Sequence, residues 1–528
     1  MAVIVLTADQ TLMSDYRDLP LATFFSCIPN DYVLSRLAYK ALAPPPEQNG
    51  GIALRAPYGL RKFESILMRR FKPKEVVVAL PNHIERFIGP ETKMIGVHAM
   101  DPLGLGPVSM TFTMGGRMTP YTKASFTALM EQIRKMRPPS CKVAVGGTGT
   151  WQFDSRPNAR SELGIDHVVS GELEKVGLQM VDAILSGNAP PIMKAGNAQA
   201  PSIEEIPAIR NASMHGLVEV MRGCPRGCLY CEAYLRRLRN IPPDLISKEI
   251  KVNAKSGLTN ASLHSDDFFL YGVEDMRTLV PNREAVVSLF QIAMSIPGIL
   301  SAAPTHGTVS AAVADPLMIE EISRVVRAGP KRWVGVQCGL ETGSPELIKS
   351  TMTRKALPFS AEEWSDILVK AVEIFNRNYW YPAFTVMMGL PGETSEDAWA
   401  TVDLIDRLES VPGNRFIIAP LSFVPVGVLK GKEFFNVDAM VDEANYNVAY
   451  RCWRHLLLEM DAHLWSFSRM SFIAKVMINM VGRAGGRYIM KFIERYGRLK
   501  GFEIRKPGTV VASSRLTHAG TRPSPSSR

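Results

Sequence analysis

Short apolar runs alternate with longer amphipathic stretches through the first 190 residues of the chain. Five of these runs are rich in β-branched residues and have the length of strands; they lie at residues 3–6, 76–80, 94–97, 143–145 and 167–169. Apolar runs separated by helical stretches are typical of a parallel sheet with helices on both faces. We therefore predict a doubly wound α/β domain over residues 1–190.

A segment punctuated by prolines, residues 191–213, separates this domain from a second series of strand-like runs. The segment has no periodic apolar pattern and is therefore predicted to be a linker. Strands are predicted after it at residues 216–221, 261–263, 268–270, 334–337 and 383–387. The repeated order of strand and helix predicts right-handed crossovers and a partial TIM-type (β/α) barrel over residues 214–430.

The pattern of the chain becomes helical near its C-terminal end. Apolar residues recur at steps of three and four between residues 446 and 502, which predicts a helical C-terminal domain over residues 431–505. Such a stripe is more typical of packed core than of a substrate surface. The tail at residues 506–528 is rich in Ser, Thr, Pro and Gly and has no acidic residue. It is predicted to be disordered.

The chain has a formal net charge of +10 at pH 7. Residues 505–528 contain five cationic residues and no acid, so half of the excess lies in the tail. The cationic residues outside the tail form no dense basic stripe with interleaved aromatic residues. We therefore expect no nucleic-acid partner. No run of about 18 uncharged apolar residues is present, and no secretory signal is evident. We therefore expect a cytoplasmic protein without a membrane span.

Three of the seven cysteines fall within eight residues, at Cys224, Cys228 and Cys231. On an α-helix this spacing would place all three on one face. However, Gly223, Pro225 and Gly227 would together cost such a helix about 5 kcal/mol. The segment is therefore predicted to be a loop that gathers three thiols.

A loop with three thiolates and no nearby fourth ligand suits an iron–sulfur cluster with one iron left open, because structural zinc normally requires four ligands. The other cysteines are scattered, as expected in a reducing compartment. We interpret them as buried small hydrophobic residues, with the first also a possible neighbour of a cofactor: Cys27, Cys141, Cys338 and Cys452.

The Cys-x3-Cys-x2-Cys loop, with Tyr230 directly before its third cysteine, resembles the signature of the radical S-adenosylmethionine (SAM) superfamily. The resemblance implies that Cys224, Cys228 and Cys231 bind a 4Fe–4S cluster. In that family the open iron chelates the amino and carboxylate groups of SAM. Tyr230 is then expected to lie beside these cofactors.

Three further segments resemble the surfaces that bind SAM in this family. They follow predicted strands at residues 265–268, 338–344 and 389–394, and imply contacts from Asp266, Glu341 and Gly389. A carboxylate is suited to a ribose diol or an ammonium group, and glycine admits a purine without a side-chain clash. The alternatives are that Glu341 caps a helix and that the last segment is only a turn.

Glycine-bearing turns at residues 101–106 and 146–151, followed by residues 164–175, are similar to the cobalamin-binding domain that precedes the cluster domain in many radical SAM enzymes. The Asp-x-His-x-x-Gly motif that supplies a histidine to cobalt in some cobalamin enzymes is absent. A vacant or water-ligated lower face remains open, as does a ligand such as His98 or Cys27. The residues implied to contact cobalamin are Asp101, Leu103, Gly104, Gly106, Gly146, Gly147, Thr148, Gly171 and Glu172.

The resemblance implies a cobalamin-dependent radical SAM C-methyltransferase. In this class, cobalamin accepts a methyl group from one SAM and an adenosyl radical from a second SAM removes hydrogen from an unactivated carbon. That carbon then captures the methyl group of methylcobalamin. The C-terminal extension is expected to close the barrel mouth, and Tyr271 and His306 are candidate catalytic proton acceptors. An electron donor such as ferredoxin or flavodoxin is also implied.

Residues 7–14, 56–62 and 101–107 resemble an archaeal branch of these enzymes, in which glutamine C-methyltransferases modify methyl-coenzyme M reductase. The methyl acceptor is accordingly a protein residue such as glutamine, or a small molecule. The main alternative is a cobalamin-dependent radical SAM oxidoreductase or cyclase without methyl transfer. A noncatalytic electron carrier and a zinc-stabilised RNA-binding module are further alternatives. A methylthiotransferase is disfavoured, because only Cys27 and Cys141 precede the linker.

Overall fold

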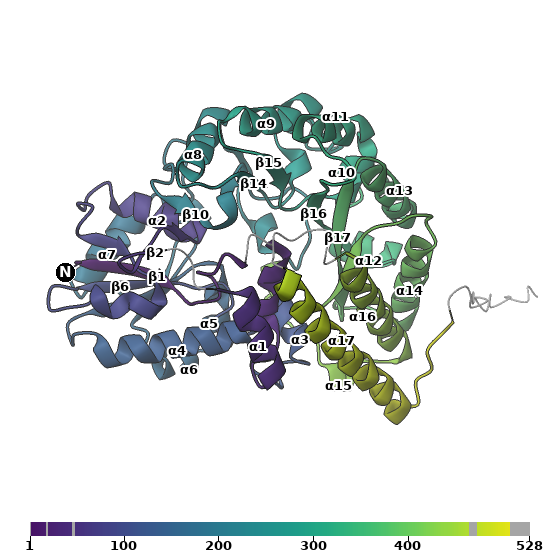
Figure 1. The fold of residues 1–528 in the computed structure, drawn as a ribbon, viewed down its shortest axis with the longest axis horizontal. Coiled ribbons are helices and arrows are strands. Elements are labelled where there is room, and N and C mark those ends of the chain that lie inside the picture. Colours follow the sequence, from purple (N-terminus) through teal and green to yellow (C-terminus); the bar gives the residue numbers. More distant parts are fainter. Residues whose placement is uncertain (1, 17–19, 45–47, 464–471, 507–528) are drawn as a thin grey trace, which may run out of the picture.

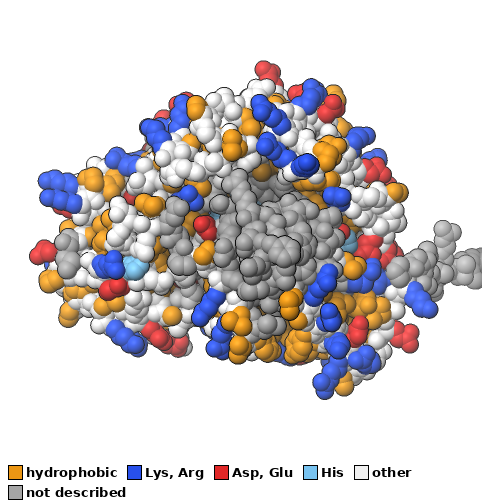
Figure 2. Space-filling view, viewed as in Figure 1, with side chains coloured by type: hydrophobic (Ala, Val, Ile, Leu, Met, Phe, Trp, Pro, Cys, Tyr) orange, Lys and Arg blue, Asp and Glu red, His pale blue; other side chains and the backbone are white. Residues whose placement is uncertain are grey.

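The computed structural model describes residues 2–16, 20–44, 48–463 and 472–506 of the chain (Figure 1). All but the first residue of the predicted basic tail therefore lies outside the described residues. Within them, no helix is both long enough and apolar enough to cross a membrane. On the face drawn in Figure 2, Lys and Arg side chains are spread around the rim of the molecule and do not form one continuous patch.

The N-terminal domain contains one parallel sheet of six strands in the order β5-β1-β6-β7-β8-β9. The predicted doubly wound domain is thereby confirmed. The sixth strand, at the edge, lies in the segment predicted to be a linker. The strands are β1 (Ile4–Ala8), β5 (Val76–Val78), β6 (Met94–His98), β7 (Lys142–Gly146), β8 (His167–Ser170) and β9 (Ile192–Lys194).

The direction in which strands are added to this sheet reverses at β1. The chain passes from β1 to β5 on one side and then to β6 on the other. Helices α2 (Tyr58–Leu67) and α7 (Gly177–Leu185) cover one face, and α4 (Tyr121–Met136) covers the other. In such sheets a ligand binds beyond the carboxyl ends of the strands at this reversal. That edge is formed by the ends of β1 and β6.

Six parallel strands form the predicted partial barrel, in two groups of three joined by a bridge between His306 and Gln337 (Figure 1). Helices α8 (Pro243–Lys255), α9 (Arg283–Ser295) and α13 (Trp364–Arg377) lie on its outside. The strands are β11 (Leu217–Glu219), β14 (Asn260–His264), β15 (Ser301–Pro304), β16 (Val334–Glu341), β17 (Trp380–Met388) and β18 (Ile417–Ser422).

The prediction of a strand at residues 268–270 is wrong. Phe268–Leu270 is a 3-10 turn, and its apolar side chains pack edge-on or stacked against other rings, including those of Phe290 and Phe375. The apolar run therefore indicates burial and not a strand. Strands β15 and β18 escaped prediction. The sequence of β15, Ser-Ala-Ala-Pro, has no β-branched residue and ends in proline, and that of β18, Ile-Ile-Ala-Pro-Leu-Ser, has a proline in its middle.

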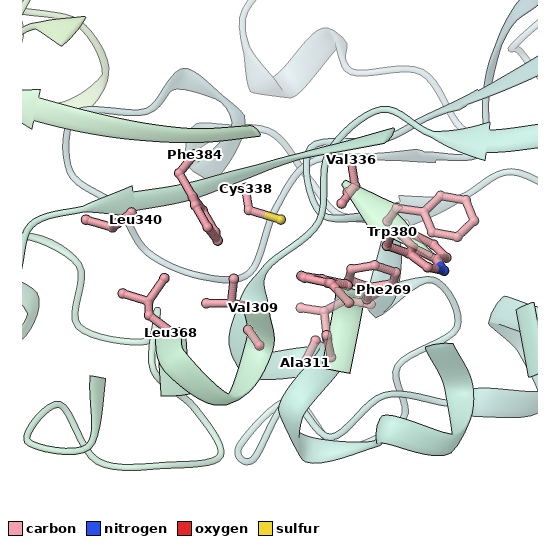
Figure 3. Packing of buried hydrophobic residues seen from close by; sticks show 14 of the residues in the cluster. Phe269, Val309, Ala311, Val336, Cys338, Leu340, Leu368, Trp380 and Phe384 are labelled. Carbon is pink, nitrogen blue, oxygen red and sulfur yellow. The ribbon is translucent and has the colours of Figure 1, made fainter. Parts of the chain in front are cut away.

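Alternate residues of the barrel strands face two different environments. On β14, Ala261 and Leu263 are buried in the core beneath the helices, so Asn260, Ser262 and His264 point into the barrel. Figure 3 shows the outer layer around β16, where Cys338 lies among Val309, Leu340 and Phe384. The interpretation of Cys338 as a buried small hydrophobic residue is confirmed by its 3% exposure. The barrel interior is consequently more polar than its wall.

The predicted helical C-terminal region consists of α16 (Glu443–His463) and α17 (Phe472–Lys500). Helix α16 packs on α14 (Ser395–Glu409) and β18, and His455 is held between the Glu409 carboxylate and the Phe416 carbonyl. Helix α17 lies against α16 and reaches α1 (Val33–Leu42) of the N-terminal domain (Figure 1). The C-terminal helices therefore connect the barrel to the other domain.

Candidate active site

The cysteine loop lies between two short antiparallel strands, β12 (Met221–Arg222) and β13 (Arg239–Asn240). The predicted loop is confirmed. Gly223 begins it with a φ of 84°, and a Cβ there would lie 2.8 and 2.9 Å from the carbonyl oxygens of Arg236 and Arg237. Glycine is therefore required at this position both by its conformation and by the close approach of the returning chain.

Backbone hydrogen bonds fix the loop. The Cys224 amide donates to the Ala233 carbonyl at 3.2 Å, and the Cys231 amide donates to the Cys228 carbonyl at 3.1 Å. A second glycine, Gly427, approaches from the barrel rim, where a Cβ would lie 2.7 Å from the Leu229 carbonyl oxygen. All three cysteines remain partly exposed within this scaffold. The loop thus presents its thiols while its backbone is held from both sides.

Burial raises the pKa of each of the three thiols, to about 11 at Cys228. Binding a metal therefore requires protons to be displaced from them. Among the described residues, no three Cys, His, Asp or Glu side chains surround a position for a single ion. Three thiolates from one loop are a donor set that iron–sulfur clusters use, in which each thiolate binds its own iron. The donor set fits the cluster.

Arg226, between the first two cysteines, is buried and holds the cysteine loop in place, a role that the sequence did not predict. Its Nε donates to Asp267 Oδ2 at 2.9 Å, and the side chains of both residues are almost fully buried. Its Nη1 donates to the Leu357 carbonyl at 2.6 Å. Asp267 also accepts hydrogen bonds from the amide and hydroxyl of Thr308. Arg226 therefore ties the cysteine loop to the carboxyl ends of β14 and β15.

Glu341, predicted to contact SAM, forms a buried ion pair with Lys355 at 2.8 Å. Its second carboxylate oxygen accepts a hydrogen bond from Thr385 at 3.3 Å. Burial lowers the pKa of Lys355, but the charges of Glu341 and of the Cys228 and Cys224 thiolates raise it above its usual value. Lys355 therefore lies within electrostatic reach of both the cluster loop and Glu341.

Of the other residues predicted to contact SAM, the structure places Tyr230 and Asp266 beside the same loop, whereas the contacts of Gly389 are with Phe435 and Glu393. The Tyr230 hydroxyl contacts the Met352 sulfur at 3.2 Å, and the nearby charges of Glu341 and Cys228 contribute to raising its pKa, after burial. Asp266 is partly exposed and contributes to the raised pKa of Cys231. Gly389 faces Phe435, whose ring a Cβ would meet at 1.9 Å. The glycine thus already accommodates one of the chain's own aromatic rings.

The two predicted proton acceptors have different surroundings. Tyr271 is buried in the hydrophobic core, and its hydroxyl donates to the Ile241 carbonyl at 2.9 Å. The His306 imidazole shares the Thr305 hydroxyl with His264, with distances of 3.0 and 2.9 Å. Burial lowers the pKa of His306 to about 4 and also lowers that of His264. The barrel interior therefore contains two neutral imidazoles, of which only His306 was predicted.

Asp101 organises the loop after β6. Its Oδ1 accepts hydrogen bonds from the Gly106 amide at 2.9 Å and from Gln152 Nε2 at 2.6 Å, and its Oδ2 accepts one from the Ser109 hydroxyl. Gln152 in turn accepts a hydrogen bond from the Leu103 amide. These contacts leave the Asp101 carboxylate engaged by the protein itself. Its role is to hold the loop that contains Leu103, Gly104 and Gly106.

The glycines at the carboxyl edge of the sheet allow its loops to approach each other. A Cβ at Gly147, which has a φ of 108°, would lie 2.4 Å from the Ala99 carbonyl oxygen. A Cβ at Gly171 would lie 2.1 Å from the Ala195 carbonyl oxygen. At Gly146 the closest atom would be 3.5 Å away, and Thr148 is exposed. The surface available to a ligand on this edge is therefore centred on Gly146 and Thr148.

Two guanidinium groups, those of Arg222 and Arg239, connect this edge to the strands that flank the cysteine loop. Arg222, two residues before Cys224, contacts Glu172 at 2.9 Å, Glu174 at 2.7 Å and Glu219 at 2.7 Å. Glu172 also pairs with Arg239 at 2.6 Å. Burial raises the pKa of Glu172, but the two arginines lower it overall. Glu172, predicted to contact cobalamin, thus joins the N-terminal domain to the cluster loop.

Contacts on the other side of the sheet edge complete the interface. Thr111, in α3 (Pro107–Phe112), accepts a hydrogen bond from the Ser422 amide at the end of β18. In α2, Lys62 forms a buried ion pair with Glu249 of the barrel at 2.6 Å. The segments that follow β6 and β8 at this edge of the sheet therefore contact the barrel domain, through Thr111 and Glu172 respectively.

Residues 218–405 match the family model of the radical SAM superfamily. They form a radical SAM domain. Among curated proteins, tRNA-2-methylthio-N(6)-dimethylallyladenosine synthases are similar: that of Thermotoga petrophila is 26% identical, with 41% of this chain and 45% of the relative covered. The Bacillus subtilis enzyme is 24% identical, with 45% and 44% covered. The chain thus spans about half the length of the curated relatives it matches.

A solved structure shares the fold over more of the chain. It is that of TsrM from Kitasatospora setae, a radical SAM methyltransferase with cobalamin and a 4Fe–4S cluster bound, which is 14% identical with a TM-score of 0.51. The likeness covers 81% of this chain and 74% of that one. TsrM with tryptophan and a SAM analogue bound gives a TM-score of 0.52, again at 14% identity, with 81% and 75% covered. The likeness therefore extends beyond the radical SAM domain.

Proposed function

We propose that this chain is a cobalamin-dependent radical SAM C-methyltransferase. The observation that carries the proposal is the placement of the three-cysteine loop beside the glycine-bearing edge of the N-terminal sheet, with Arg222 joining the two. A cluster on Cys224, Cys228 and Cys231 would leave one iron for SAM. That iron would then lie at the junction of the two domains. The relationship in fold to TsrM supports a corrinoid on the facing edge.

The charges beside the cysteine loop fit SAM. SAM carries an ammonium and a carboxylate on its methionine part, and Glu341 and Lys355 provide one group of each opposite sign, 2.8 Å apart. We assign Lys355 to the carboxylate and Glu341 to the amino group, whose N–H bonds can still donate when its lone pair is bound to the open iron. Asp266, partly exposed at the end of β14, is suited to the ribose hydroxyls. When bound, SAM supplies the methyl group and, after reduction by the cluster, a carbon radical.

The sheet edge fits a corrinoid. It offers the partly exposed Gly146 and the exposed Thr148, and loops that hydrogen bonds of Asp101 and ion pairs of Glu172 hold in place. Cobalamin bound there would supply a cobalt ion that carries methyl groups. The chain's residues bind it, exclude water and hold it opposite the barrel, and this exclusion protects reactive carbon species from side reactions.

The methyl acceptor is proposed to enter the polar interior of the barrel. Its imidazoles, His264 and His306, can accept hydrogen bonds from a substrate, because burial lowers the pKa of both and so favours their neutral form. The same shift makes them weak proton acceptors. A protein residue such as glutamine remains the proposed acceptor, with a small molecule as the other class. The proposed electron donor is a ferredoxin or flavodoxin. Without methyl transfer, the same site would serve the oxidoreductase or cyclase alternative.

The decisive experiment uses the full chain, reconstituted without oxygen with iron, sulfide and cobalamin. With SAM, a reductant and candidate acceptors, it should produce S-adenosylhomocysteine together with 5′-deoxyadenosine, and a product with one methyl group in place of hydrogen. Only 5′-deoxyadenosine would indicate the alternative without methyl transfer. Cys228→Ser should abolish both products, whereas the control Cys141→Ala, which also removes one thiol, should retain them. Failure of SAM cleavage by the iron-loaded protein would refute the proposal.

A further inference from the structure

His98 is the last residue of β6, at the point where the order of strands in the N-terminal sheet reverses. Its neighbours on β6, Met94 and Gly96, share its face of the sheet, which is the face covered by α2 and α7. The segments that follow β6 and β8 at the same edge of the sheet contact the barrel domain through Thr111 and Glu172. The imidazole is therefore located where a ligand of this sheet would bind.

Two glycines make room for the His98 ring. A Cβ at Gly147 would lie 2.9 Å from Nδ1 and 3.0 Å from Cε1, and a Cβ at Gly59 would lie 3.2 Å from Cε1. Gly59 is near the start of α2, and Gly147 follows β7. The ring is consequently held between two backbone segments with no side chain beside it on either. Such a fit restricts the orientation of an imidazole without using its nitrogens.

No residue that the structure describes donates to or accepts a hydrogen bond from the His98 ring. The other histidines of the barrel and interface differ: His167, His264, His306 and His455 each have a hydrogen-bond partner. His98 is nevertheless not among the residues with a fully buried polar atom that lacks a partner. Its ring is therefore accessible, and a nitrogen of the ring can take a partner from a bound ligand.

We infer that His98 is the lower axial ligand of the cobalt ion in a corrinoid bound at the edge of the N-terminal sheet. The inference rests on the proposed function. The two glycines approach Nδ1 and Cε1 most closely, so we assign the bond to Nε2. A lone pair of this nitrogen would be shared with cobalt, and the bond requires transfer of neither a proton nor an electron.

The chemistry of the side chain suits this role. Metals bind the neutral imidazole, and burial lowers the pKa of His98 to about 4, so the ring needs to release no proton near neutral pH. The other candidate, Cys27, would have to lose a proton, because burial raises the pKa of its thiol to about 11. The Cys27 thiol also lies 3.7 Å from the Ser26 hydroxyl, within hydrogen-bonding reach. His98 is therefore the better donor.

The test uses cobinamide, a corrinoid that lacks the nucleotide base, so that any nitrogen bound below the cobalt comes from the protein. The full chain is loaded with cobinamide and reduced to the Co(II) state, and its electron paramagnetic resonance spectrum is recorded. Coordination by His98 should split the cobalt lines into triplets from one nitrogen. Protein grown with ¹⁵N-labelled histidine should give doublets instead of triplets. This labelling shows that the nitrogen belongs to a histidine without any change to the sequence.

Variants identify the residue. His98→Gln should retain the corrinoid but lose the splitting, whereas His83→Ala, which changes a histidine of the same domain after β5, should keep it. A bound corrinoid without nitrogen splitting in the unaltered chain, or splitting that persists in His98→Gln, would overturn the assignment and leave the proposed function intact. Failure of the unaltered chain to retain any corrinoid after gel filtration would overturn both.

Discussion

The ammonium group of Lys355 and the carboxylate of Glu341 form a buried ion pair, although Lys355 also lies close enough to Cys228 to influence its pKa. One cation is thus shared between the cysteine loop and the carboxylate expected to bind SAM. Binding of SAM would then replace the ion pair between Lys355 and Glu341 by one contact of each residue with SAM. This exchange keeps buried charges compensated before and after the ligand arrives.

Replacing Lys355 by Met should therefore affect both folding and ligand binding. It leaves the Glu341 carboxylate buried without a cation, and we expect a loss of about 3–5 kcal/mol in the free energy of unfolding. Adding Glu341→Gln removes the unpaired charge and should restore most of the stability, measured by urea unfolding. SAM affinity of the cluster-loaded protein, measured by calorimetry, should be lost in both variants. Recovery of SAM binding in the double variant would contradict the assigned roles.

Gly339 provides a second test of the same pair. A Cβ at this position would lie 2.0 Å from Glu341 Oε1 and 2.4 Å from Lys355 Nζ. Because these atoms end flexible side chains, Gly339→Ala should displace the pair without unfolding the barrel, and should weaken SAM binding at least tenfold. Gly335→Ala is the matched control on the same strand, since a Cβ there has no atom within 4 Å. Equal SAM affinity in the two variants would argue against a role for the pair in binding.

The buried ion pair between Arg226 and Asp267 should determine whether the cysteine loop retains its cluster. Arg226→Gln leaves the Asp267 carboxylate buried without its cation, with an expected cost of about 3–5 kcal/mol in unfolding free energy. The amount of iron that each chain retains after anaerobic desalting should also fall in this variant. The control is Arg324→Gln, which removes an exposed ion pair with Glu320 and should change neither quantity. Full iron retention by Arg226→Gln would show that the cysteines hold the cluster without this support.

Glu219 should make the protein sensitive to acid. Burial alone would raise the pKa of this carboxyl, but Arg222 outweighs burial and lowers it to about 2, from 4.5 in the unfolded chain. Because the folded pKa is the lower one, its contribution is complete above pH 4.5 and is lost as pH falls toward 2. The shift corresponds to about 3 kcal/mol.

The acid dependence can be measured by urea unfolding between pH 6 and pH 3. Stability of the unaltered chain should fall more steeply over this interval than that of Glu219→Gln, which has no proton to gain at this position. The matched control Glu320→Gln, at an exposed carboxylate, should follow the unaltered chain. Parallel curves for all three proteins would assign the acid sensitivity to other groups.

The cysteine loop and most of the strands could be predicted because their signals are local. Gly223 and Pro225 exclude a helix wherever the segment lies, and a run such as Val76–Val78 favours a buried strand in any parallel sheet. Strand β15 has no such signal and proline interrupts the one in β18, so their parallel pairing with β14 and β17 establishes them. The turn at Phe268–Leu270 has an apolar run like that of a strand but is not one, since the run reflects burial alone.

The sequence by itself determined the order of the two α/β domains, the three-cysteine loop and the presence of carboxylates and glycines after particular strands. Only the tertiary structure decided which charges meet. Lys355 reaches Glu341 across 14 positions, Arg226 reaches Asp267 across 41, and Arg222 reaches Glu172 across 50. The physical reason is that such contacts depend on how strands and domains are placed relative to one another, and on the burial that makes one partner necessary to the other. Neither is encoded in the few residues around each side chain.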